Sequence, residues 1–207
     1  MKLLYIQASP NKEKSSSRQV ANYLVSKLNV ASSKILDLEA HPLPHINSMA
    51  ISAFFTPPET HSPEQKVAIK LSDEKVDELL SSDIVVISTP MWNFGVPSVL
   101  KAWFDHISRA GKTFKYTSEG LKGLLEGKKV FVVVSSGSVF SEGPFASMDQ
   151  LGPWIRTTFN FLGVSDLEII RVEGTNTFEA AATAIAKAKA RVDQLVLNQT
   201  LKEESHA

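Results

Sequence analysis

The sequence predicts an α/β protein in which a five-stranded parallel sheet lies between two layers of helices, a three-layer, doubly wound arrangement. Five short apolar runs alternate along the chain with five segments of helical periodicity. The apolar runs are nearly continuous, which is typical of strands buried on both faces of a parallel sheet. Regular alternation of strand and helix then favours parallel strands joined by right-handed crossovers.

The predicted elements follow one another without an internal repeat or a long linker. The expected strands are Leu3–Ala8, Ser33–Leu38, Ile84–Ser88, Lys129–Ser135 and Asp166–Val172. Apolar residues recurring every three or four positions predict helices after the serines at 15–17, over Gln65–Ser82, from about Ser98, over Met148–Leu162 and over Phe178–Leu197. The alternating segment Gly111–Thr117 predicts a short extended arm.

Right-handed crossovers favour the flavodoxin-like strand order 2-1-3-4-5 for such a chain. In that order the first, third and fourth strands are neighbours. The loops that begin at Ser9, Pro90 and Ser135 therefore meet at the carboxyl edge of the sheet. Open α/β sheets bind ligands at this edge, so the three loops together are the predicted binding site.

Composition limits the class of partner. The 207-residue chain carries 22 Lys and Arg residues against 22 Asp and Glu residues. A balanced charge gives no field that would attract nucleic acid or an anionic membrane surface, so neither is an expected partner. There is no cysteine, which excludes disulfides, thiolate catalysis and Cys-ligated metal centres, and fits a cytoplasmic location.

The chain is expected to form one domain over residues 1–200, followed by a frayed tail over residues 201–207. The apolar N-terminal run is too short for a signal peptide. No apolar run approaches the roughly 20 residues of a membrane span.

The loop Thr89–Pro97 is the most distinctive stretch of the sequence. Pro90, Gly95 and Pro97 prevent a regular element from passing through it. What remains is a short, stiff loop that carries a thioether, an indole, an amide and a phenyl ring. Its position after a buried strand suits a flat aromatic ligand.

The first loop contains Ser9 and then Ser15, Ser16 and Ser17 immediately before a helix. A helix N-terminus offers unpaired N–H groups and the positive end of a dipole, and serine hydroxyls add donors, so the loop fits a phosphate. Ordinary helix capping by serine is the alternative. The loop lacks both the P-loop motif and the Rossmann glycine motif.

The third loop, Ser135–Pro144, is rich in small residues. Gly137 and the serines around it allow backbone N–H groups to approach a ligand closely.

Residues 41–63 are expected to be irregular, since prolines occur at positions 42, 44, 57, 58 and 63. Ile51, Phe54 and Phe55 are too apolar to be left in water, so this stretch should pack on a neighbour. His41, His45 and His61 lack the spacing of a metal site and are expected at the surface. No metal site is predicted.

Over nearly its whole length the chain resembles the FMN-dependent NADH:azo-compound oxidoreductases (azoreductases), which are relatives of the flavodoxin-like quinone reductases. The resemblance is specific at the serines of the first loop, at Pro90–Phe94, at Arg109–Thr117 and at Ser135–Pro144. It implies that the FMN phosphate is bound by Ser9, Ser15, Ser16 and Ser17. It implies contacts to the ribityl chain and the flavin ring from Pro90, Met91, Trp92, Asn93, Phe94, Gly95, Ser135, Ser136, Gly137 and Ser138.

The sequence departs from the family pattern at two positions. Trp92 stands where tyrosine is more usual, and it still supplies a flat amphipathic surface. Ser136 stands in a stretch that often reads Ser-Arg-Gly-Gly, so the usual arginine is missing. FMN binding should survive, because it depends largely on backbone groups.

The resemblance also implies a function: NADH or NADPH reduces bound FMN, and an azo compound or a quinone reoxidises it in a ping-pong cycle. No protein acid or base is required. Tyr116 and Phe161 are the expected walls of the substrate pocket, with ordinary packing as the alternative. The resemblance implies a homodimer whose pocket forms between the subunits, with residues 41–63 near the interface.

Two other classes of function remain open from the sequence. One is a flavodoxin-like electron carrier, although such carriers are commonly strongly acidic and this chain is neutral. The other is a non-catalytic nucleotide-binding module without flavin.

Overall fold

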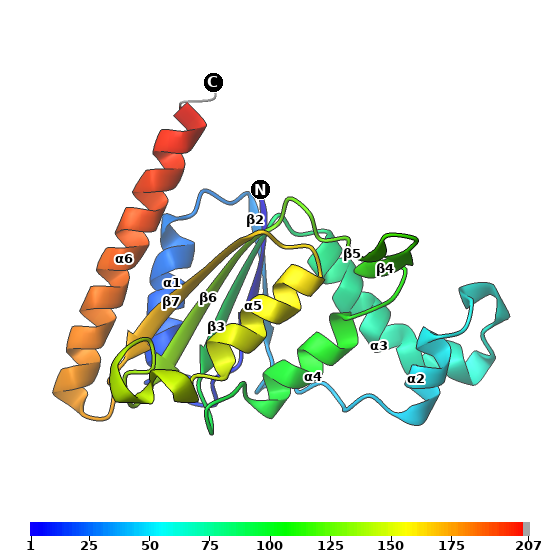
Figure 1. The fold of residues 1–207 in the computed structure, drawn as a ribbon, viewed down its shortest axis with the longest axis horizontal. Helices are drawn as coiled ribbons and strands as arrows, with labels where there is room; N and C mark the ends of the chain where they lie inside the picture. Colours follow the sequence, from blue (N-terminus) through cyan, green and yellow to red (C-terminus); the bar gives the residue numbers. More distant parts are fainter. Residues whose placement is uncertain (205–207) are drawn as a thin grey trace.

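The computed structural model describes residues 1–204, with side chains described as far as residue 197. Its central sheet has five parallel strands in the order β2-β1-β3-β6-β7 (Figure 1). The strands are β1 (Lys2–Gln7), β2 (Ser32–Asp37), β3 (Ile84–Pro90), β6 (Lys129–Ser136) and β7 (Asp166–Glu173). The two strands that lie between β3 and β6 along the chain form a separate hairpin. When only the five strands of the central sheet are numbered along the chain, their order is the predicted 2-1-3-4-5.

Helices cover both faces of the sheet (Figure 1). The helices on one face are α1 (Ser16–Lys27) and α6 (Phe178–Glu204), and those on the other are α3 (Pro63–Leu80), α4 (Ser98–Ile107) and α5 (Leu151–Phe161). Each face has its own hydrophobic cluster. Trp103, Phe104 and Phe159 are buried in one cluster, and Leu24 and Phe131 are buried in the other. The three central strands, β1, β3 and β6, are covered on both sides, and their sequences are mostly apolar, whereas the edge strands β2 and β7 carry more polar and charged residues.

Local sequence signals explain where the helices begin. The Ser15 hydroxyl accepts the N–H of Arg18 and caps α1. Helix α3 starts two residues before the predicted Gln65, because Ser62 and Gln65 form a capping box and Pro63 occupies the first turn.

The region predicted to be irregular contains a helix. Residues 41–63 include α2 (Ser48–Phe54) and the 3-10 turn η1 (Pro58–Thr60), so that expectation was wrong in part. Asn47 caps α2, and Ala50 and Ala53 pack against Ile69 of α3. A seven-residue helix between prolines is too short to show a clear period in the sequence.

The extended arm predicted at 111–117 is half of a hairpin. Strand β4 (Phe114–Thr117) pairs antiparallel with β5 (Gly120–Gly123), which the sequence did not reveal. A Cβ atom on Gly123 would lie 2.1 Å from the backbone nitrogen of Gly163. The hairpin therefore docks backbone against backbone at the end of α5, which only glycine permits.

The two largest of the remaining boundary differences lie at the start of one helix and at the end of another. The helix expected from Met148 begins at Leu151, after a 3-10 segment, η2 (Gly143–Met148). Helix α6 continues beyond the predicted Leu197 to Glu204. The frayed tail expected over 201–207 stays a prediction, since residues 205–207 lie outside the part described. Within the described chain, no helix is both long and apolar enough to cross a membrane.

Candidate functional site

The structure brings the three predicted loops to one edge of the sheet. Gln7, at the end of β1, lies in register with both Asp37 and Ser88. Pro90, at the end of β3, lies in register with Ser135 of β6. The adjacent ends are tied by backbone hydrogen bonds, including that from Met91 N–H to the Ser135 carbonyl (2.8 Å). The loops therefore begin side by side, as parallel neighbours require.

The first loop forms a cradle that we define by Ser9, Ser15, Ser16 and Ser17. Ser9, Ser15 and Ser17 are buried and Ser16 is half-buried. The Ser15 hydroxyl lies 3.1 Å from that of Ser17 and caps α1. In the described part of the chain, the N–H groups of Ser16 and Ser17 donate to no protein acceptor. Helix capping thus uses one serine and leaves the other donors for an anion at the positive end of the helix dipole.

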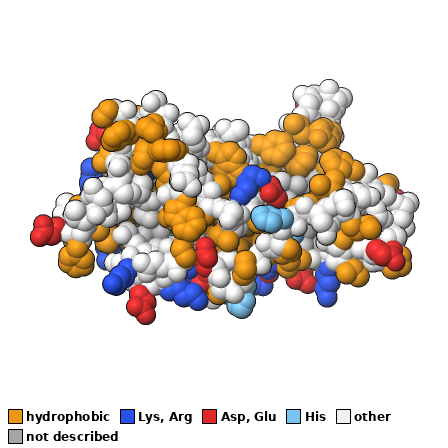
Figure 2. Space-filling view, turned by 90° about the horizontal axis from the view of Figure 1, so that it is seen from below, with side chains coloured by type: hydrophobic (Ala, Val, Ile, Leu, Met, Phe, Trp, Pro, Cys, Tyr) orange, Lys and Arg blue, Asp and Glu red, His pale blue; other side chains and the backbone are white. Residues whose placement is uncertain are grey.

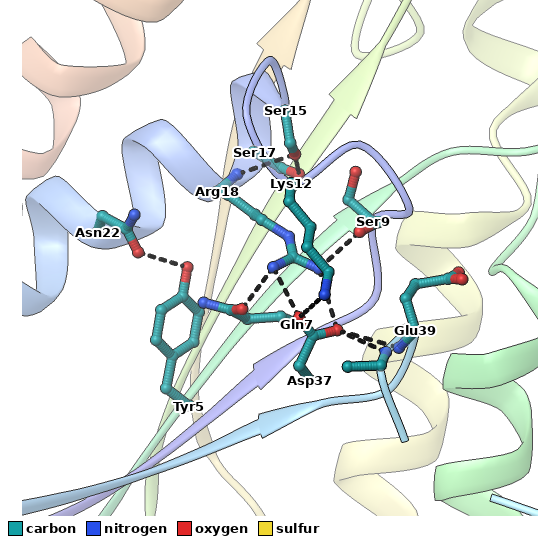
Figure 3. Close-up of polar contacts among 11 residues, drawn as sticks. Tyr5, Gln7, Ser9, Lys12, Ser15, Ser17, Arg18, Asn22, Asp37 and Glu39 are labelled. Carbon is teal, nitrogen blue, oxygen red and sulfur yellow. Dashed lines mark hydrogen bonds and ion pairs between the residues drawn. The ribbon is translucent and has the colours of Figure 1, made fainter. Parts of the chain in front are cut away.

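Arg18 lies at the centre of the polar network beside the cradle (Figure 3). Its two terminal guanidinium nitrogens donate to the Ser9 carbonyl (2.6 Å), to the Gln7 side chain (2.6 Å) and to both carboxylate oxygens of Asp37 (3.1 and 3.2 Å). One side chain of α1 therefore links the end of β1, the start of the cradle and the end of β2. Because Arg18 is only 6% exposed, these contacts are shielded from water.

Asp37 completes this network. Its Oδ1 also accepts the N–H groups of Glu39 and Ala40, at 3.1 Å each. Partial burial raises the pKa of Asp37, but the hydrogen bonds from Arg18 and these N–H groups lower it more, so the pKa lies below its ordinary value. The carboxylate is therefore ionised at neutral pH and balances the Arg18 charge.

The second loop makes a tight turn. The N–H groups of Trp92 and Gly95 each donate to the other residue's carbonyl, at 3.0 and 2.9 Å. The two central residues, Asn93 and Phe94, have φ of +46° and +69°. Positive φ at both central positions defines a type I′ turn, which asparagine adopts more easily than phenylalanine. Phe94 therefore holds a strained conformation, which costs roughly 1–2 kcal/mol.

The same turn exposes aromatic surface at the edge of the sheet. Trp92 and Phe94 are 46% and 42% exposed, while Met91 packs partly against the core. Phe145 and Met148 of η2 are also exposed. Figure 2 looks onto this edge from below and shows hydrophobic side chains reaching the surface at several points. Strain and exposed apolar surface in one turn are typical of a binding site.

The third loop leaves β6 through a turn fixed by its own serines. The Ser136 hydroxyl donates to the Ser138 carbonyl (2.8 Å), and the Ser136 carbonyl accepts the N–H and hydroxyl of Thr175. Gly137 is exposed and has open space where a Cβ would lie. The protein itself does not require glycine there, so any need for close approach comes from a ligand.

A charged network from β7 supports the third loop. Arg171 pairs with Asp149, just before α5, and lies 3.5 Å from Glu173. The Glu173 carboxylate in turn accepts the N–H of Phe140 (3.0 Å) and the hydroxyl of Ser141. The loop that follows Ser138 is thus tied to the edge strand at both ends. The sequence gives no signal for this network, since its contacts between β7 and the segment before α5 join residues that are 22 to 33 positions apart.

Tyr116 and Phe161, the predicted walls of the substrate pocket, lie away from the three loops. Both pack on Phe114, with ring centroids 5.9 and 4.7 Å apart, and they are 70% and 37% exposed. The β4–β5 hairpin and the end of α5 lie beside the opposite end of the sheet from the three loops (Figure 1). The structure brings these two residues together with each other, but not with the three loops of the same chain.

The histidines of the described residues hold structural positions or lie at the surface. Among the described residues no cluster of three His, Asp or Glu side chains could hold a metal ion. His41 and His45 are exposed as expected, but His61 is buried, which corrects the sequence prediction. Its Nε2 lies 2.9 and 3.0 Å from the carbonyls of Ala53 and Thr56, so it must donate and holds the end of α2.

Arg18 is the principal site residue that sequence reasoning missed. A local signal existed: an arginine in the first turn of a helix opposes the dipole and calls for an explanation. Its partners Gln7 and Asp37 could not be identified without the strand register.

The chemical groups of the three loops match the parts of FMN. A half-enclosed anion cradle, an exposed aromatic turn and a loop with free backbone N–H groups correspond to a phosphate, a flat ring and the polar edge of that ring. Asn93, Phe94, Gly137 and Ser138 have N–H groups that donate to no acceptor within the described residues.

Comparison with known proteins agrees with this geometry. A family described by its flavodoxin-like fold matches residues 1–196. The FMN-dependent NADH:quinone oxidoreductase 2 of Hahella chejuensis is 48% identical over 202 residues, which cover 95% of this chain and 100% of that protein. The FMN-dependent NADH:quinone oxidoreductase of Beijerinckia indica is 42% identical, covering 94% of this chain and 98% of that protein.

Solved structures show the same relationship. An azoreductase from Bacillus anthracis Sterne superposes with a TM-score of 0.86 at 28% identity, covering 95% of this chain and 98% of that one. An FMN-dependent NADH-azoreductase from Bacillus anthracis Ames Ancestor, solved in complex with FMN, has a TM-score of 0.82 at 26% identity, covering 94% and 99%. This chain therefore belongs to the flavodoxin-like family that contains the FMN-dependent NADH:quinone oxidoreductases.

Proposed function

We propose that this protein is an FMN-dependent NAD(P)H oxidoreductase that reduces quinones and azo compounds in two half-reactions at one site. The observation that carries the proposal is the meeting of three loops at one sheet edge, with an anion cradle beside an exposed aromatic turn. The names of its relatives support the same activity. Residues 1–200 act in this proposal as a single FMN-binding domain.

In this proposal the cradle binds the phosphate of FMN. The hydroxyls of Ser9, Ser15 and Ser17 and the N–H groups at the start of α1 meet its charge. Hydrogen bonds to a charged group contribute about 1.5–3 kcal/mol each, so a few of them retain the cofactor.

The other two loops hold the ring. Trp92 and Phe94 supply flat surface, and the N–H groups of Asn93, Gly137 and Ser138 are available for its polar edge. When bound, FMN supplies the two-electron chemistry, taking a hydride from NADH or NADPH and passing it to the oxidant. The protein's part is to orient the ring, and to place fixed dipoles where charge develops on reduction. No side chain is assigned as an acid or base.

The substrate pocket is completed, in this proposal, by a second copy of the chain. Tyr116 and Phe161 are exposed aromatic residues that do not reach the three loops of their own chain. Phe55 and Ile51 in the 41–63 region are also exposed, by 78% and 48%. A homodimer would cover such surface and could bring Tyr116 and Phe161 to the partner's flavin.

Anaerobic half-reactions test the proposed activity. FMN-loaded protein is mixed with NADH or NADPH, and bleaching of the flavin band is followed. The reduced protein is then mixed with a benzoquinone or an azo dye, and reoxidation is followed together with formation of the reduced acceptor. We expect at least one nucleotide to bleach the flavin and both oxidants to restore it.

An electron carrier would behave differently. It would bind FMN, but neither NADH nor NADPH would bleach it directly at a useful rate. The neutral charge of this chain and the names of its relatives favour the enzyme. Protein that stays colourless after FMN is added would contradict both flavin-based functions.

Sedimentation of the FMN-loaded protein tests the homodimer. We expect the mass of two chains, and a Phe55→Ser, Ile51→Ser double variant that sediments as one chain. A monomeric wild type that turns over normally would contradict the shared pocket.

A further inference from the structure

The position of Arg18 beside the cradle assigns it a role that charge alone does not explain. We propose that Arg18 is a positioning residue, which presets the cradle for phosphate by holding the Ser9 carbonyl and the end of β2, and is not itself a ligand of the phosphate. The inference rests on the function proposed above, because it concerns the same FMN phosphate.

Arg18 stands where stability alone would not place an arginine. It occupies the first turn of α1, where the helix dipole disfavours a cation. Its side chain is buried, and its Nε has no hydrogen-bond partner among the described residues. Natural sequences break such local rules mainly where function requires it.

The contact with Ser9 shows what the arginine does. One guanidinium nitrogen donates to the Ser9 carbonyl at 2.6 Å, and Figure 3 shows the Ser9 hydroxyl pointing away from Arg18. The next residue is Pro10, which has no N–H. If the peptide group between Ser9 and Pro10 rotated, it could turn only its carbonyl oxygen toward the cradle, because Pro10 has no N–H to donate. A carbonyl oxygen would repel a phosphate. Arg18 prevents that rotation.

The second contact fixes the charge of the region. Both Asp37 oxygens accept from Arg18, at 3.1 and 3.2 Å, so the pair is neutral. A further cation, Lys12, lies 3.9 Å from Asp37 and is mostly exposed. Two accounts of Arg18 therefore make opposite predictions for Asp37→Asn. If Arg18 acts through charge, freeing its charge tightens FMN binding, whereas if it acts through position, losing its anchor weakens binding.

Binding of FMN and riboflavin to apoprotein separates these accounts, since riboflavin lacks the phosphate. The variants are Arg18→Lys, Arg18→Gln and Asp37→Asn. Arg191→Gln is the matched control, because Arg191 is an exposed arginine of α6 paired with Glu168 at 3.7 Å. Quenching of flavin fluorescence gives each Kd, and circular dichroism checks the fold.

We expect both Arg18 variants to raise the Kd for FMN by about tenfold or more, because a displaced cradle loses one of its own hydrogen bonds to the charged phosphate. Lysine should not rescue, because a single ammonium cannot bridge Ser9, Gln7 and Asp37. Asp37→Asn should raise the FMN Kd as well. The riboflavin Kd should stay within about twofold of wild type for all variants, as in the control.

Three results would overturn the proposal. They are full rescue by Arg18→Lys, tighter FMN binding by Asp37→Asn, and equal weakening of FMN and riboflavin. If an Arg18 variant does not fold, Asp37→Asn still decides between position and charge. Failure of the proposed function is distinguishable, because wild-type protein itself would then bind no FMN or would not be reduced.

Discussion

The cradle after β1 and the turn after β3 prepare for a ligand in different ways. The cradle is buried except at Ser16, the Ser15 hydroxyl caps its helix, and none of its serines has a positive φ. The turn is exposed and holds Asn93 and Phe94 in left-handed conformations. The cradle has its polar donors already in place before a ligand binds. The turn has exposed aromatic surface and a strained backbone, which contacts with a ligand would compensate.

This difference shows that recognition of the phosphate and of the ring are separable in one site. Loss of a cradle group should weaken the binding of FMN and leave the binding of riboflavin unchanged. Loss of a turn residue should affect both flavins equally, since both carry the ring. Pairs of titrations with FMN and riboflavin therefore test the assignment of each region.

The largest effect is expected for Ser17→Ala. The Ser17 hydroxyl is buried and its described partner is the Ser15 hydroxyl, so its removal leaves the cap of α1 in place. We expect the FMN Kd to rise by about 10- to 100-fold, because a hydrogen bond to a charged group is lost. Ser26→Ala near the other end of α1, where the hydroxyl donates to the Tyr23 carbonyl, is the control. A similar loss of riboflavin affinity would contradict the assignment.

Asn93→Ala should raise the Kd for both FMN and riboflavin by about tenfold, because alanine is strained at φ +46° and the turn loses its shape. Asp105→Ala is the comparison, since Asp105 is an exposed residue of α4 paired with Lys101. Fluorescence titration of the two variants measures the difference. Equal retention of flavin by both would count against the turn as part of the site.

Phe94→Gly should separate stability from binding. Glycine adopts φ +69° without strain, so the free energy of unfolding of the apoprotein should rise by about 1 kcal/mol. Both flavins should bind more weakly, since the exposed ring is gone. Phe94→Ala keeps the strain and serves as the control in urea denaturation. A gain in stability for alanine as well would mean that the ring, not the backbone, is unfavourable.

The smallest effect concerns pH and the Arg18–Asp37 pair. Because the pKa of Asp37 is lowered by folding, its contribution to stability is fully present above its ordinary pKa of 3.8 and is lost as pH falls through the lower folded value. We expect the stability difference between wild type and Asp37→Asn to be constant from pH 5 to 7 and to shrink below pH 4, as the Asp37 carboxylate becomes protonated. Urea denaturation of the apoproteins across this range checks it. A difference that grows on acidification would contradict the lowered pKa.

The sequence was sufficient for the sheet and for the meeting of the three predicted loops at one edge of it. Continuous apolar runs and helical stripes specify strands and helices locally, and the crossover rule then orders the strands. The ends of β1, β3 and β6 meet for that reason alone.

What the sequence could not supply depends on contacts between distant segments. The docking of the β4–β5 hairpin depends on the meeting of Gly123 with Gly163. The strain at Phe94 arises from a turn with positive φ at both central positions. Neither central residue is glycine, so the sequence does not indicate this conformation. Arg18 became interpretable only when the register placed Gln7 and Asp37 beside it.

Titration of wild-type apoprotein with FMN and with riboflavin tests the central claim most directly, namely that the loop after β1 is a phosphate cradle. Several hydrogen bonds to the phosphate predict that FMN binds about 100-fold or more tightly than riboflavin, and that Ser17→Ala removes a large part of this ratio. Equal affinity of the wild-type protein for the two flavins would contradict it.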